Sequence, residues 1–168
     1  MNAYRALCLA AVVLAFVVVV MGAYVRLSDA GLGCPDWPLC YGRPLPAEIA
    51  DQDALAKAWK EMGHRYLAGT LGVAIMLLAI GAWRARRHVA LATAIVLLVV
   101  LQATLGKWTV TMLLKPAIVT AHLLGGMATL ALLAWLALAA AHNAGAALLL
   151  VALVVLNFSA FRGLRFSS

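Results

Sequence analysis

The sequence has little charge and very few acidic residues. Of its 168 residues 11% are charged and 66% are hydrophobic, and the mean hydropathy is +1.01. This composition excludes a soluble domain of the usual kind. The net charge of +7 does not form a basic patch with interleaved aromatic residues, so no nucleic-acid partner is expected. We therefore expect an integral membrane protein.

The sequence contains several long apolar runs. A bilayer core about 30 Å thick requires about 20 apolar residues in a helix. Four runs meet that length: residues 7–25, 66–83, 89–106 and 116–141. A fifth, residues 144–161, is marginal because it is short and contains polar residues. The sequence predicts an all-α membrane protein, with a four-transmembrane-helix bundle in residues 1–143 and a partial fifth helix with a short basic tail in residues 144–168.

The basic residues predict the orientation. They flank the apolar runs at Arg5, Arg84, Arg86 and Arg87, and basic flanks are typical of the cytoplasmic side. We expect a multi-pass protein of the plasma membrane, with a cytoplasmic amino terminus and residues 26–65 outside. All six acidic residues fall in that outer segment. A cleaved signal peptide is the alternative for the first run, but residues 21–26 show no persuasive small-x-small cleavage site.

The outer segment divides into two parts. Residues 27–42 contain prolines, glycines and aspartates that favour a compact loop. Cys34 and Cys40 lie close together there on the oxidising side, which favours a disulfide, with reactive free thiols as the alternative. In residues 46–62 the spacing of Leu55, Trp59 and Met62 predicts an amphipathic helix lying on the outer surface.

Two histidines lie near the outer ends of apolar runs. Glu61 precedes His64 by three positions, so both side chains share one helical face. His64 and His122 each lie about 20 residues, or roughly 30 Å, from the cytoplasmic end of their run. Two imidazoles at one depth in a four-helix bundle, with glycines nearby, can hold a haem iron from both faces. The alternative is that His64 and Glu61 are interfacial and that the glycines serve helix packing.

Several motifs resemble the haem A synthase family, also called CtaA/Cox15. They are GAYVRLS at residues 22–28, AGLGCPDWPLC at residues 30–40, Glu61 with His64 and Arg65, and TAHL at residues 120–123. The resemblance covers roughly residues 22–141. It implies an eight-helix membrane protein of two pseudo-symmetric halves that converts haem O to haem A by oxidising a ring methyl to a formyl group.

The resemblance also assigns roles to particular residues. It implies that His64 and His122 face the iron of haem O, that Glu61 is an essential carboxylate, and that Cys34 and Cys40 are the outer-loop cysteine pair. From its charge and position we expect Arg65 to pair with a propionate. Glu61 would either stabilise positive charge at the oxidised carbon or take a proton from attacking water, and two hydroxylations followed by loss of water would give the aldehyde.

The second half of the family, with the two histidines that bind haem b, is missing from this sequence. We expect a fragment of a longer chain, with a short homodimerising member as the alternative. Haem O synthase and an electron acceptor are partners that the resemblance implies. The rival functions are a non-catalytic haem-binding membrane module, a structural bundle and a thiol redox protein, although the last would call for a Cys-x-x-Cys motif that is absent.

Overall fold

The computed structural model describes residues 3–46, 49 and 51–165, and regular secondary structure in them is helical. The helices are α1 (Ala3–Leu27), α2 (Gln52–Ala85), α3 (Val89–Thr111) and α4 (Pro116–Arg165). Each contains a stretch long and apolar enough to cross a membrane, which in α4 is Pro116–His142. The predicted all-α membrane fold is confirmed.

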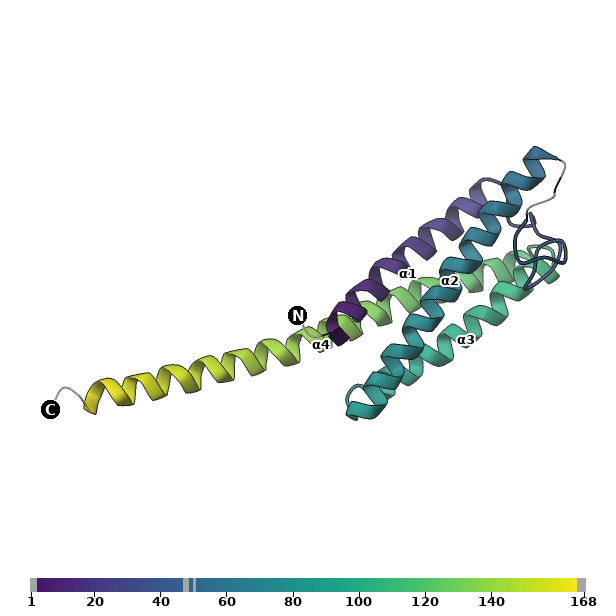
Figure 1. Ribbon diagram of the computed structural model, residues 1–168. Coiled ribbons are helices and arrows are strands. Elements are labelled where there is room, and N and C mark those ends of the chain that lie inside the picture. The colour runs from purple at the N-terminus through teal and green to yellow at the C-terminus, as the bar shows by residue number, and fades with distance from the viewer. Residues whose placement is uncertain (1–2, 47–48, 50, 166–168) are drawn as a thin grey trace.

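The four helices form a ring in which α2 and α4 lie diagonally opposite. α1 packs against α2 and α4, and α3 packs against the same two helices (Figure 1). The segment between α1 and α2 covers one end of the ring, which we call the loop end. Side chains from α2 and α4 at one depth can therefore face each other across the axis of the bundle.

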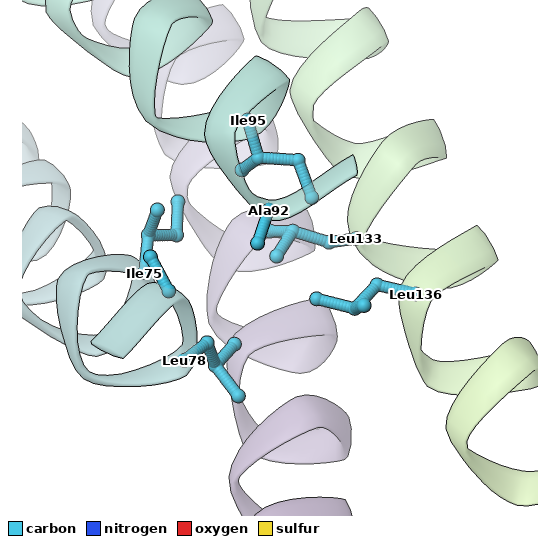
Figure 2. A pocket seen from close by; sticks show the side chains of 7 residues that line it. Ile75, Leu78, Ala92, Ile95, Leu133 and Leu136 are labelled. Atoms are coloured by element: carbon cyan, nitrogen blue, oxygen red, sulfur yellow. The ribbon is translucent and has the colours of Figure 1, made fainter. Parts of the chain in front are cut away.

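The half of the bundle away from the loop end is a close-packed aliphatic core. Figure 2 shows side chains of α2, α3 and α4 converging there. The residues that surround this point are Ile75, Leu78, Ala79, Ala92, Ile95, Leu133 and Leu136. Cys8 of α1 is 1% exposed within the same core, so it behaves as a small packing residue. This half packs the helices together, and the polar residues of the candidate site lie toward the loop end.

The amphipathic helix predicted over residues 46–62 is not a separate element. Helix begins at Gln52 and continues without interruption as α2. Asp51 caps it, because its carboxylate accepts a hydrogen bond of 3.0 Å from the N–H of Asp53. Gly63 lies between the predicted surface helix and the apolar run, but a single glycine does not destabilise a helix enough to interrupt it there. Residues 47, 48 and 50 of the predicted helix lie outside the described residues.

The marginal fifth segment, residues 144–161, is continuous with α4. The helix has 50 residues, or about 75 Å at 1.5 Å per residue, and its last part extends away from the other three helices (Figure 1). The sequence predicts a division of the chain into a bundle, residues 1–143, and a tail, residues 144–168. The helix is continuous across residues 143 and 144, and the division into these two parts stays a prediction. Residues 166–168 of the predicted tail lie outside the described residues.

Candidate functional site

His64 of α2 packs directly on the backbone of α1. A Cβ atom at Gly22 would lie 3.0 Å from Cε1 of His64, which is tighter than ordinary contact. The imidazole also lies beside the backbone of Val18, one turn earlier on α1. Gly22 thus makes room for the ring of His64.

His122 of α4 repeats this arrangement on α3. A Cβ atom at Gly106 would lie 3.4 Å from Cε1 of His122. The sequence around the two glycines is related, since each precedes an aromatic residue by two positions, Tyr24 in α1 and Trp108 in α3. The pairs α1–α2 and α3–α4 therefore each place a glycine against a histidine ring. This spacing from glycine to aromatic residue is a sequence signal that could have indicated the packing.

The two imidazoles lie close enough to interact electrostatically. In the part of the chain that the structure describes, Nδ1 of both His64 and His122 is buried and has no hydrogen-bond partner. A buried polar atom without a partner costs about 1–3 kcal/mol, so two such atoms on facing helices fit a site that binds a ligand. Among the described residues no three His, Cys, Asp or Glu side chains gather as a metal cluster. Paired imidazoles on diagonal helices, each beside a glycine, fit a haem iron held from two sides.

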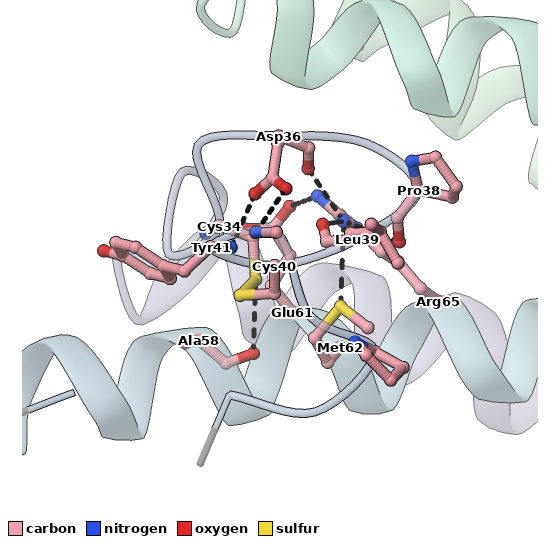
Figure 3. The surroundings of a disulfide bond; sticks show 12 residues. Cys34, Asp36, Pro38, Leu39, Cys40, Tyr41, Ala58, Glu61, Met62 and Arg65 are labelled. Carbon is pink, nitrogen blue, oxygen red and sulfur yellow. Dashed lines mark hydrogen bonds and ion pairs between the residues drawn. A yellow bond between two sulfur atoms is a disulfide. The ribbon is translucent and has the colours of Figure 1, made fainter. Parts of the chain in front are cut away.

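Glu61 lies one helical turn nearer the loop end than His64 and is 5% exposed. Its Oε2 accepts a hydrogen bond of 2.9 Å from the N–H of Cys34, and its Oε1 accepts one of 2.5 Å from Nη2 of Arg65 (Figure 3). Both carboxylate oxygens are therefore held in place. The predicted Glu61–His64 pair shares a helical face, and the carboxylate is fixed by the loop as well as by its own helix.

Cys34 and Cys40 form a disulfide, one of the two alternatives that the sequence left open. Both are fully buried where the loop lies on α2. A Cβ atom at Gly33 would lie 2.5 Å from the backbone carbon of Lys57, so only glycine allows this approach. The close contact brings the N–H of Cys34 to Glu61.

Arg65 binds the loop by several hydrogen bonds. Its Nη1 donates to the carbonyl oxygens of Leu39 at 2.8 Å and Asp36 at 3.0 Å (Figure 3). Its Nη2 donates to Glu61, as described above. The loop contacts were not anticipated from the sequence, because arginine binding to loop carbonyls has no local pattern. The pairing of Arg65 with a propionate stays a prediction.

The loop also reaches the far side of the bundle. A Cβ atom at Gly31 would lie 3.2 Å from Cδ2 of Leu114, in the turn between α3 and α4. The ammonium group of Lys107 lies 5.9 Å from the ring centroid of Trp37. Because the loop contacts α2, α3 and the α3–α4 turn, it covers the end of the bundle at which the two histidines lie.

Comparison with known proteins agrees with these features. The profile of the family described as "Cytochrome oxidase assembly protein", COX15-CtaA, matches residues 5–141. Heme A synthase of Shewanella oneidensis is 46% identical over 136 residues, covering 72% of this chain and 41% of that protein. The heme A synthases of Alkalihalophilus pseudofirmus and Halalkalibacterium halodurans are 34% and 33% identical over 111 residues, 36% of each protein. The chain thus spans about two fifths of the length of these relatives.

Proposed function

Because the chain belongs to the COX15-CtaA family of cytochrome oxidase assembly proteins, we propose that it binds haem O in haem A synthesis, and that His64 and His122 would hold the iron. The observation that supports this most directly is the repeated packing of Gly22 on His64 and Gly106 on His122. The two half-buried imidazoles lie on diagonal helices, and Nδ1 of each is buried and has no partner among the described residues. The proposed reaction is oxidation of a ring methyl of haem O to a formyl group.

Glu61 is the proposed catalytic carboxylate. It lies on the same face of α2 as His64, one turn away, and the N–H of Cys34 and the guanidinium of Arg65 fix its position. A carboxylate held in this way needs no reorganisation when positive charge develops at a nearby carbon. The alternative role, accepting a proton from water, requires the same fixed position.

The loop and Arg65 are proposed to form the cover of the site. Arg65 joins the loop to α2, and the disulfide holds the loop compact. In the proposed complex the guanidinium also lies on the side where the propionates of haem O would meet water. A haem b for electron transfer would come from a second half or a second copy of the chain, with haem O synthase and an electron acceptor as further partners.

The ligand assignment is tested by optical titration of the detergent-purified chain with haem O. We expect a low-spin spectrum with the wild-type chain and its loss in His64→Ala and in His122→Ala. His142→Ala is the matched control, because that histidine is exposed on α4 and lies far from the pair. A pyridine haemochrome assay after incubation with haem O and a reconstituted electron-transfer system then reports whether haem A forms.

The outcomes separate the functions that compete here. Haem O bound and converted supports the synthase. Haem O bound by both histidines without conversion supports a haem-binding module that lacks its electron-transfer half. Failure of the wild-type chain to bind haem O would contradict the ligand assignment.

A further inference from the structure

Gln102 is a polar residue in the apolar helix α3, and it has no role in the function proposed above. Its Nε2 is buried and has no hydrogen-bond partner in the described residues. An amide in a membrane helix normally finds a partner, because the bilayer core offers no water. The unpartnered donor therefore suggests a polar group that a bound ligand supplies.

The position of the amide is fixed by Gly125 of α4. A Cβ atom at Gly125 would overlap Nε2 of Gln102, whereas one at Gly126 would lie 4.0 Å from Oε1, which is ordinary contact. Gly125 follows His122 by three positions and so lies on the same face of α4. Gln102 precedes Gly106, the glycine that faces His122, by four positions on α3. The amide thus lies about one helical turn, roughly 5.4 Å, farther from the loop end than His122.

A haem bound between His64 and His122 would have a defined direction along the bundle. Its two propionates are carboxylates, which are costly in the bilayer core, so they favour the loop end. The opposite edge of the macrocycle then lies deeper, at the depth of Gln102. In haem O that edge carries a hydroxylated farnesyl chain, where haem b carries only a vinyl group.

We propose that Nε2 of Gln102 donates a hydrogen bond to the hydroxyl oxygen of this chain and so selects haem O over haem b. The proposal rests on the proposed function, since it assumes a haem between the two histidines. A buried donor that a substrate hydroxyl satisfies discriminates against an analogue that lacks the hydroxyl, because the donor is then left unpaired. Gln102 is in this sense a specificity residue for the substrate.

The test is optical titration of the full chain with haem O and, separately, with haem b. Gln102→Met keeps the length of the side chain and removes the donor. We expect this change to weaken haem O binding about 3- to 10-fold, which corresponds to one hydrogen bond. We expect haem b binding to change by less than about twofold, because haem b has no hydroxyl group for Nε2 to bind.

A pair of glycine variants tests the same contact from α4. Gly125→Ala should displace the amide and reduce haem O binding selectively, as Gln102→Met does. Gly126→Ala is the matched control, with the same change in the neighbouring residue and no close contact to relieve. Far-UV circular dichroism of each variant checks that the helices are intact.

The outcomes distinguish this inference from the proposed function. If neither haem binds the wild-type chain, the ligand assignment fails and the inference with it. If both haems bind and Gln102→Met weakens them equally, or weakens neither, the selectivity is refuted while the histidine site stands. A selective loss for haem O in both Gln102→Met and Gly125→Ala supports the hydrogen bond.

Discussion

Replacing Gly33 by alanine should lift the disulfide loop from α2. The added Cβ would lie 2.5 Å from the carbonyl carbon of Lys57, 2.6 Å from its oxygen and 2.7 Å from the nitrogen of Ala58. These are helix backbone atoms, which cannot move aside as a flexible side chain can. The loop must therefore retreat, and the 2.9 Å hydrogen bond from the N–H of Cys34 to Glu61 is lost.

The size of the effect follows from that hydrogen bond. A hydrogen bond to a charged group contributes about 1.5–3 kcal/mol, and the buried carboxylate that loses its donor cannot turn to water instead. We expect Gly33→Ala to lower the free energy of unfolding by about 2–3 kcal/mol. For a chain of this size that corresponds to a midpoint lower by roughly 4–12 °C.

Thermal unfolding in detergent, followed by circular dichroism, measures the change. Gly69→Ala in α2 is the control, because a Cβ there meets no atom within 4 Å. That variant should be unchanged or more stable by up to about 1 kcal/mol, since alanine favours helix over glycine. Equal midpoints for Gly33→Ala and the wild-type chain would show that the loop does not depend on this contact, and the reasoning would be wrong.

Three further variants test other contacts of the site. Arg65→Ala should destabilise the chain by about 3–5 kcal/mol because it removes the cation that pairs with the buried carboxylate of Glu61, and Arg65→Ala combined with Glu61→Gln should recover part of the loss in the same thermal assay. Gly22→Ala should displace the ring of His64 and weaken haem O binding in an optical titration, and unchanged binding would argue that the ring can shift freely. Asp51→Ala should cost about 1 kcal/mol by removing the cap of α2, with Asp51→Asn as the variant that keeps the cap, and identical midpoints for both would contradict the capping role.

The fold was largely predictable because membrane helices are specified by length and hydropathy alone. All four predicted runs lie inside helices of the structure. The errors lie at the ends of those runs, where a polar helix continues an apolar one. Residues 52–62 form the first part of α2, whereas the apolar spacing in residues 46–62 predicted a helix lying on the outer surface. Hydropathy predicts which part of a helix lies in the membrane, but it does not predict the residue at which the helix begins.

The site was predictable to a lesser degree. The sequence singled out His64, His122 and Glu61, and the structure brings the two imidazoles near each other. It did not indicate the contact of Gly33 with α2 or the hydrogen bonds from Arg65 to the loop. Those contacts join residues more than 20 positions apart, and they depend on how the loop folds back on the helix, which no local spacing records.

The near-repeat of the two helical hairpins suggests where the chemistry resides. Aligning Gly22 with Gly106 and His64 with His122 superimposes the two glycine–histidine pairs. The same alignment sets Glu61 against Val119, and it sets Gln102 against Val18. A repeated hairpin can supply two equivalent histidines to the two faces of an iron. Oxidation of one methyl group on one edge of a macrocycle, in contrast, needs surroundings that differ between the two hairpins.

Glu61 and Gln102 each differ from the residue at the equivalent position of the other hairpin. Glu61 lies nearer the loop end than His64, and Gln102 lies farther from the loop end than His122. Each has a buried polar group. Among the described residues the carboxylate of Glu61 has hydrogen-bond partners, and Nε2 of Gln102 has none. In the proposed haem complex, the unequal residues would distinguish the two edges of the macrocycle along the bundle, while the two equivalent histidines would hold its iron. On this reasoning, Gln102→Val, which introduces the residue found at the equivalent position of α1, should leave iron ligation intact and remove the preference for haem O. The absorbance spectrum reports the ligation, and the titrations with haem O and haem b report the preference.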